Sequence, residues 1–176
     1  RFDRQYGELP LGYDHKYVYS HFGFNLKVSD MQAAIGCAQL EKFPKFVEKR
    51  KENRDKLYEG LKDLEEFYFV SAQPNSDPSW FGFMLVLKDK LNFTRNEIVE
   101  FLESNKIQTR NLFAGNMTKH PVFDSMILDT DYKIVGNLDI TNKIMNDGFW
   151  IGLYPGMSDD VINYMIKKIR EFVKSK

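Results

Sequence analysis

The chain has 176 residues, of which 43% are hydrophobic and 15% aromatic, and its 25 basic and 25 acidic side chains give a formal net charge of zero. This composition is that of about one well-packed domain, and it argues against intrinsic disorder and against a nucleic-acid-binding surface. No apolar run reaches the ~20 residues that a membrane-spanning helix needs, and the single cysteine, Cys37, cannot form an internal disulfide.

The first 28 residues are rich in Tyr, Gly, Pro and His and have no sustained period, which predicts an ordered loop or short strands. Ser29 and Gln32 then form a capping-box pair, in which a hydroxyl caps the first free amides and an amide side chain reaches back. A helix is therefore predicted over about 29–43, directly after a polar loop at 23–27.

Pro44 is expected to end this first helix, because proline has no amide hydrogen to donate within a helix. A second helix is expected over about 45–64, where the apolar positions fall on one side at helical spacing. We divide the first part of the chain into a loop segment, 1–28, and two linking helices within 29–66.

Strands and helices alternate in the remainder. Strands are expected at about 66–70, 80–87, 106–112 and 149–154, helices at about 94–105, 138–146 and 158–174, and an irregular stretch with a short helix over 113–135. Thr94 and Glu97 form a second capping box. This order predicts an α/β fold of the α+β kind over 67–176, a small sheet with helices packed on one face.

The residues alone do not form a complete active site. The three histidines are His15, His21 and His120, and no nucleophile elbow, Walker loop or His-Glu-x-x-His motif occurs. His15 and His21 have a poor metal-ligand spacing, and the carboxylates are scattered over helix surfaces. We therefore assign no catalytic residue and no metal ligand.

The loop at 23–27 and its helix resemble one branch of the pyridoxal-phosphate enzymes, the DegT/DnrJ/EryC1/StrS sugar aminotransferases and dehydratases. In that branch the loop reads Gly-x-Asn-x-Arg/Lys and leads into Asp-x-Gln-Ala-Ala, as Gly23 to Lys27 and Asp30 to Ala34 do here. Further matching segments lie along the whole chain, at 13–17, 19–21, 76–83, 109–116 and 149–156. Within the branch the chain is most similar to the CDP-4-dehydro-6-deoxyglucose 3-dehydratases of lipopolysaccharide and O-antigen biosynthesis.

The resemblance implies the C-terminal portion of an enzyme with the aspartate-aminotransferase-like fold (fold type I). The whole enzyme would remove the C3 hydroxyl of a 4-keto-6-deoxyhexose linked to CDP, with pyridoxal or pyridoxamine 5'-phosphate as electron sink. The cofactor-binding domain, its catalytic His or Lys and the cysteines of a [2Fe–2S] cluster would lie upstream of this chain. The chain alone is therefore expected to bind no cofactor and to be inactive.

The resemblance also implies a cytoplasmic homodimer that binds a nucleotide-sugar, with a possible reductase partner and with neither nucleic acid nor membrane as partner. Carried over by position, Asn25 and Lys27 would cross the dimer interface to the cofactor phosphate of the neighbouring subunit, as an amide donor and a positive charge. The alternatives are that Asn25 tolerates an unusual turn and that Lys27 is merely solvated.

Five further residues are candidates for contact with the nucleotide-sugar: Trp80, Phe81, Arg110, Asn116 and His120. The two aromatic residues could equally belong to the core, and Arg110 could form a structural salt bridge. Two other functions stay open, a fragment of a sugar aminotransferase and a non-catalytic binding domain. A histidine at the cofactor position would favour the dehydratase, and a lysine there the aminotransferase.

Overall fold

The computed structural model describes residues 5, 7–11, 14, 18–19, 21–24 and 26–176. The chain divides into two compact units, 1–41 and 42–176. In the first unit, a loop leads into the start of α1 (Asp30–Leu61). The predicted capping box is present there. The backbone N–H of Ser29 donates to Gln32 Oε1 at 3.0 Å, and the backbone N–H of Gln32 donates to Ser29 Oγ at 3.4 Å.

Helix α1 is a single helix with Pro44 inside it, so the prediction of two helices separated at Pro44 is wrong. Proline at this position removes one hydrogen bond, the one to the carbonyl of Leu40. Leu40 is exposed, so water can solvate the free carbonyl. The good helix formers on both sides then maintain the helix through one missing bond.

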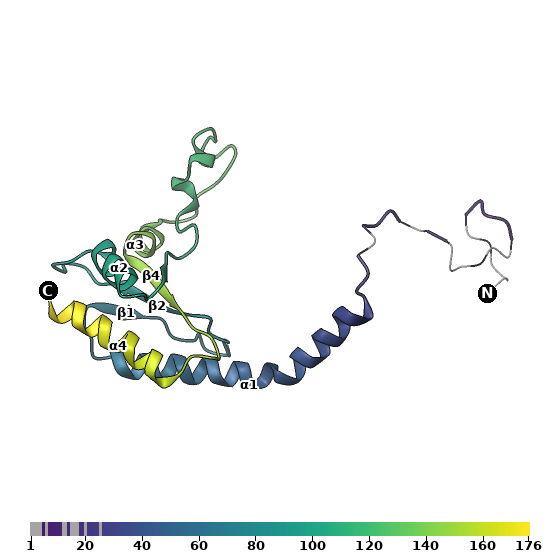
Figure 1. Cartoon of the computed structure of the whole chain (residues 1–176). Coiled ribbons are helices and arrows are strands. Elements are labelled where there is room, and N and C mark those ends of the chain that lie inside the picture. The colour runs from purple at the N-terminus through teal and green to yellow at the C-terminus, as the bar shows by residue number, and fades with distance from the viewer. Residues whose placement is uncertain (1–4, 6, 12–13, 15–17, 20, 25) are drawn as a thin grey trace. The chain divides into compact units, whose positions relative to one another are not determined.

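The second unit contains a four-stranded sheet in the order β1-β2-β4-β3, with every neighbouring pair antiparallel. Its elements after α1 are β1 (Phe67–Phe69), β2 (Gly82–Leu87), α2 (Arg95–Ser104), β3 (Thr109–Arg110), the short 3-10 helices η2 (Met117–Lys119) and η3 (Pro121–Phe123), α3 (Asp139–Asp147), β4 (Gly148–Gly152) and α4 (Asp159–Lys174). The predicted α/β class with a small sheet is confirmed (Figure 1). Strand β3 is shorter than predicted, because Lys106 (φ 65°) and Phe113 (φ 43°) turn the backbone at either end.

One face of the sheet carries the hydrophobic core. Strands β2 and β4 point alternate side chains to this face, among them Phe83, Leu85, Phe149 and Ile151. They pack in one cluster with residues of three helices: Leu57 and Leu61 of α1, Ile98 and Leu102 of α2, and Ile162, Ile169 and Phe172 of α4. Helix α4 carries the strongest apolar stripe of the chain on its inner side, which is why it lies along the sheet (Figure 1).

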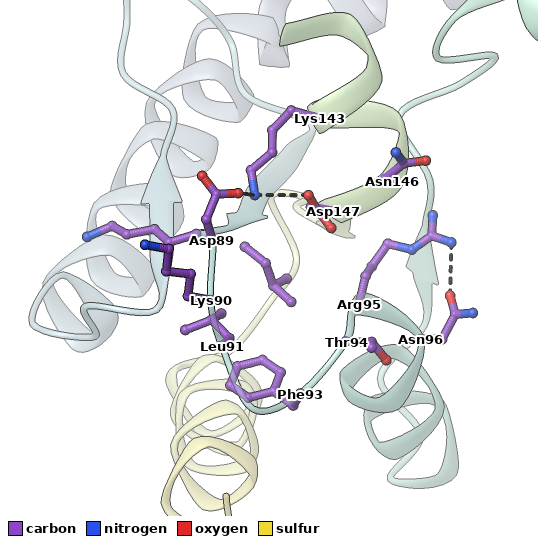
Figure 2. A pocket seen from close by; sticks show the side chains of 12 residues that line it. Asp89, Lys90, Leu91, Phe93, Thr94, Arg95, Asn96, Lys143, Asn146 and Asp147 are labelled. Carbon is purple, nitrogen blue, oxygen red and sulfur yellow. Dashed lines mark hydrogen bonds and ion pairs between the residues drawn. The ribbon is translucent and has the colours of Figure 1, made fainter. Parts of the chain in front are cut away.

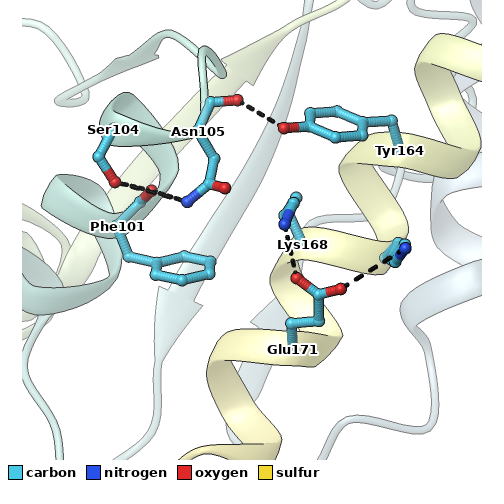
Figure 3. Close-up of polar contacts among 7 residues, drawn as sticks. Phe101, Ser104, Asn105, Tyr164, Lys168 and Glu171 are labelled. Carbon is cyan, nitrogen blue, oxygen red and sulfur yellow. Dashed lines mark hydrogen bonds and ion pairs between the residues drawn. The ribbon is translucent and has the colours of Figure 1, made fainter.

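Polar contacts fix α4 against its neighbours. The hydroxyl of Tyr164 donates to the carbonyl of Asn105 at the end of α2, at 3.0 Å (Figure 3). Within α4 itself, Glu171 pairs with Lys168 at 2.7 Å. On the other side, Arg170 Nε donates to the carbonyl of Gly60 in α1 at 2.8 Å. Each helix within the described residues is too short or too polar to cross a bilayer.

The opposite face of the sheet carries Met84 and Trp150, which are directly paired in the register of β2 and β4. Helix α3 contacts both strands at one end of this face, where the Ile144 carbonyl and the Met84 methyl group lie against Gly148. The other end of this face is not covered by α3, and the candidate site lies there.

Candidate functional site

An open cleft of about 320 Å³ lies on this second face of the sheet. We call it the aromatic cleft, and its lining residues are Pro78, Ser79, Trp80, Phe81, Gly82, Met84, Leu112, Phe113 and Trp150. They come from three places: the segment that enters β2 together with β2 itself, the segment that follows β3, and the middle of β4. The sheet brings them together because β4 pairs with both β2 and β3.

The rings of the aromatic cleft are held in a defined arrangement. Phe81 meets Trp150 edge to face, with ring centroids 5.2 Å apart, and Phe113 lies 6.4 Å from the same ring. Trp150 Nε1 donates to the carbonyl of Asn111 at 3.0 Å, which fixes the indole. Phe81 and Phe113 remain 54% and 74% exposed, so apolar ring surface is available to a ligand.

Arg110 adds positive charge to the same face. It is paired with Trp150 across β3 and β4, and directly paired residues of an antiparallel sheet point to the same side. The strand is anchored one residue earlier, where Glu103 Oε1 accepts from the amide of Thr109 at 2.5 Å and from its hydroxyl at 2.7 Å. The Thr109 amide, and after it the hydroxyl, hold the pKa of the Glu103 carboxyl below its usual value. The exposed guanidinium of Arg110 thus extends from a fixed backbone.

Asn116 and His120 stabilise the loop that follows Phe113. Asn116 is 3% exposed; its Nδ2 donates to Asn142 Oδ1 at 2.8 Å, and its Oδ1 accepts from the amide and hydroxyl of Thr118. His120 is half-buried, and its Nε2 donates to the carbonyl of Ala114 at 2.6 Å. The polar atoms of Asn116 are therefore occupied inside the protein, and this residue is not presented to a ligand.

Asn25 and Lys27 are the two residues predicted to contact the cofactor phosphate. Asn25 is outside the described residues. Lys27 is exposed and forms no ion pair with another described residue, so its charge is available to a phosphate.

A second, polar pocket of about 390 Å³ lies between the end of β2 and the start of α2 (Figure 2). Lys143 bridges Asp89 at 2.6 Å and Asp147 at 2.9 Å there. Partial burial lowers the pKa of Lys143, but hydrogen bonds to Asp89 and Asp147 outweigh it and leave the pKa raised. Arg95 is also engaged, with Asn111 at 2.8 Å and Asn96 at 2.9 Å. Because Lys143 is already paired with two carboxylates and Arg95 already donates to two asparagine side chains, we assign no ligand to this pocket. No group of His, Cys, Asp or Glu in the described part of the chain could hold a metal ion.

The structure thus places Trp80 and Phe81 in the lining of one cleft and Arg110 on the same face of the sheet as Trp150. Trp80 also packs against the hydrophobic core, as the alternative interpretation of this residue expected. Among the lining residues that were not predicted are Met84, Phe113 and Trp150. The sequence did contain an indication that Trp150 points away from the core. If Phe149 and Ile151 point into the core, strand alternation requires Trp150 to point to the opposite face. Phe113 gave no such signal, because it lies in an irregular segment at φ 43°.

The chain is similar to known proteins of one family. The DegT/DnrJ/EryC1/StrS aminotransferase family matches residues 4–170. The chain is 50% identical over 173 residues to the lipopolysaccharide biosynthesis protein RfbH of Salmonella typhimurium, covering 98% of this chain and 39% of that protein. It is 45% identical over 173 residues to dTDP-4-dehydro-2,6-dideoxy-D-glucose 3-dehydratase of Saccharopolyspora spinosa, covering 98% of this chain and 37% of that protein.

A solved structure agrees with these relatives. The structure of Escherichia coli GDP-4-keto-6-deoxy-D-mannose-3-dehydratase with bound hydrated PLP superposes with a TM-score of 0.74 at 26% identity, covering 88% of this chain and 39% of that one. The chain therefore spans about two-fifths of the length of the relatives that it matches. The predicted fold, that of a pyridoxal-phosphate aminotransferase-like enzyme, is confirmed. The chain belongs to the DegT/DnrJ/EryC1/StrS aminotransferase family.

Proposed function

We propose that this chain is the C-terminal part of a pyridoxal- or pyridoxamine-phosphate-dependent nucleotide-sugar 3-dehydratase of deoxysugar and O-antigen biosynthesis, acting in the cytoplasm on CDP-4-dehydro-6-deoxyglucose. The observation that carries the proposal is the 45% identity, over 98% of the chain, to a protein named as a sugar 3-dehydratase. Relatives named as transaminases are more distant, for example 25% identical over 80% of the chain for dTDP-4-amino-4,6-dideoxy-D-glucose transaminase of Escherichia coli.

In this proposal, the chain contributes to the cofactor site through Asn25 and Lys27. Lys27 is of the residue type that binds phosphate as a point charge, and its side chain is exposed. The amide of Asn25 would donate a hydrogen bond to the same phosphate, in the site of the neighbouring subunit of a homodimer. When bound, the cofactor supplies the electron sink for loss of the C3 hydroxyl.

The aromatic cleft and Arg110 are proposed to contact the nucleotide-sugar. Trp80 and Phe81 offer apolar ring surface, and Arg110 places a planar cation on the same face, suited to diphosphate oxygens. His120 would act indirectly, because it holds the turn at Ala114, next to Phe113 of the cleft. Asn116 would also act indirectly, because it holds the loop between Ala114 and His120.

The residues of this chain do not fit a [2Fe–2S] cluster on their own. Such clusters take four protein ligands, most often cysteine thiolates, and Cys37 is the only cysteine here. The proposal therefore assigns the cluster ligands, and any contact with a reductase partner, to polypeptide outside this chain.

Mass spectrometry of the product tests the proposed function directly. The polypeptide that contains this chain, loaded with pyridoxamine phosphate and supplied with CDP-4-dehydro-6-deoxyglucose and a reductant, should yield a sugar that has lost the C3 oxygen. The 176-residue chain alone should leave the substrate unchanged. A product that has instead gained an amino group when glutamate is supplied would establish the aminotransferase alternative.

Replacing Asn25 with Ala in the same polypeptide should weaken retention of the cofactor by about tenfold, as expected for loss of one hydrogen bond to a charged group. Absorbance of the cofactor during dialysis measures the retention. The matched control is Asn92→Ala, because Asn92 lies in the other unit and donates to the carbonyl of Lys176 at 2.5 Å. Equal retention in the Asn25 and Asn92 variants would remove Asn25 from the site.

A further inference from the structure

Trp80 is supported by an arginine of helix α1 that does not line the aromatic cleft. The guanidinium carbon of Arg54 lies 5.3 Å from the centroid of the Trp80 ring and 4.7 Å from that of Tyr58. Arg54 thus contacts both rings, while the Trp80 side chain also lines the aromatic cleft. Arg54 lines a neighbouring hollow instead, together with Lys51, Asp55 and Asp77.

Arg54 is itself fixed by several contacts. Its Nη2 donates to the carbonyl of Val70 at 3.0 Å, just after β1, and its Nη1 pairs with Asp55 at 3.2 Å. The side chain is only 14% exposed. Tyr58 meets Phe69 of β1 edge to face at 5.8 Å, so the support for Trp80 extends into the sheet.

Trp80 needs such a support because of its place in the chain. It follows a connection, residues 71–79, that has no helix or strand and is exposed from Ser71 to Asp77. A second contact with α1 holds this connection, the ion pair between Lys51 and Asp77. An exposed connection of this kind is mobile unless it is held in place, and a mobile Trp80 would present its ring to a ligand only part of the time.

We infer that Arg54 is a positioning residue of the aromatic cleft, which fixes the orientation of the Trp80 ring for contact with the nucleotide-sugar. The inference rests on the proposed function, because it takes the cleft as part of the substrate site. Arginine suits this role better than lysine, since its flat, delocalised guanidinium can stack on rings while it donates to a carbonyl at its edge.

A double-mutant cycle tests the inference in the complete polypeptide loaded with pyridoxamine phosphate, with CDP-4-dehydro-6-deoxyglucose as substrate. The variants are Arg54→Met, Trp80→Ala and the two together, and kcat and KM are measured for each. Arg54→Met should raise KM by about three- to tenfold, the range expected for one partly desolvated cation–π contact, with little change in kcat. Because Arg54 acts through Trp80, it should change KM less than twofold in the Trp80→Ala background.

The matched control is Lys49→Met. Lys49 lies on the same helix and pairs with Glu52 at 2.9 Å, away from Trp80. This variant loses the same charge and gains the same side chain, and it should leave KM unchanged.

Three outcomes would overturn the inference. Arg54→Met could leave KM unchanged, even with a lower melting temperature, as a purely structural role predicts, or it could raise KM equally with and without Trp80. An unchanged KM in Trp80→Ala would also overturn the inference. In each of these cases the proposed function still stands, provided that the wild-type polypeptide converts the substrate. A wild-type polypeptide that does not act on the nucleotide-sugar overturns the proposed function, and the inference with it.

Discussion

At the scale of single residues, Glu97 shows how one side chain can serve two purposes. Its Oε2 accepts from the Thr94 amide at 2.8 Å and so completes the capping box that begins α2. Its Oε1 pairs with Lys176, the last residue, at 2.7 Å. The Lys176 hydrogen bond, and after it those of Thr94, lower the pKa of Glu97 to about 2. The same carboxylate therefore begins a helix and holds the end of the chain.

This lowered pKa makes the stability contribution of Glu97 depend on pH. A carboxyl group whose pKa is lower in the folded protein stabilises the fold at a pH above its unfolded value of 4.5, and this stabilisation is lost as the pH falls from there toward about 2. Glu97→Gln should therefore lower the melting temperature at pH 7 and have a much smaller effect near pH 2. Thermal unfolding followed by circular dichroism at both pH values measures this. Glu100→Gln, on the same helix, is the control, and an equal drop at both pH values would contradict the prediction.

At the scale of elements, the packing of α3 against the sheet depends on a glycine. A Cβ atom on Gly148 would lie 2.5 Å from the backbone oxygen of Ile144 in α3 and 2.8 Å from the Met84 methyl group in β2. The side chain of Met84 could move, but the backbone oxygen is held by the helix. The absence of a side chain therefore allows α3 to continue directly into β4.

Gly148→Ala should destabilise the protein by about 1–3 kcal/mol, the usual cost of overpacking a site that cannot relax. The same strand offers a matched control, because a Cβ on Gly152 would meet nothing within 4 Å. Gly152→Ala should be neutral or slightly stabilising, since alanine restricts the unfolded chain more than glycine does. Urea unfolding of both variants measures the difference, and equal midpoints would show that α3 can shift away from β4.

At the scale of the whole molecule, α1 carries apolar side chains near both of its ends, and their burial differs between the two ends. Leu57 and Leu61 are fully buried in the core of the second unit. In the first unit, Met31 and Ile35, four residues apart and so on one side of the helix, are 79% and 65% exposed. Exposed apolar side chains on a chain of zero net charge favour association.

The isolated 176-residue chain should therefore associate with itself, and Ile35→Glu should shift it toward the monomer. Sedimentation velocity at several concentrations measures the change. The control is Ala33→Glu, which adds the same charge at an exposed position on the opposite side of the helix. If both variants shift the chain toward the monomer equally, the cause is the added charge and not the loss of an exposed apolar side chain.

The sequence by itself determined the local structure wherever a pattern has a period or a cap. Ser29 with Gln32 and Thr94 with Glu97 correctly marked the starts of α1 and α2, because a capping box acts within three residues. The prediction that Pro44 ends a helix was wrong. The loss of one hydrogen bond at proline is opposed by the stability of the whole helix around it, and a rule about a single residue does not include that stability.

The tertiary structure alone decided which distant residues meet. The pairing of β4 with both β2 and β3 places Phe81, Arg110 and Trp150 on one face, and no local signal in a single sequence specifies strand order. Asn116 looked from the sequence like a residue available to a ligand, and only the packing of its loop against Asn142 shows that its amide is used inside the protein. Local hydrogen bonds are encoded by neighbours in the sequence, whereas a binding surface is formed by side chains that the folded sheet brings together.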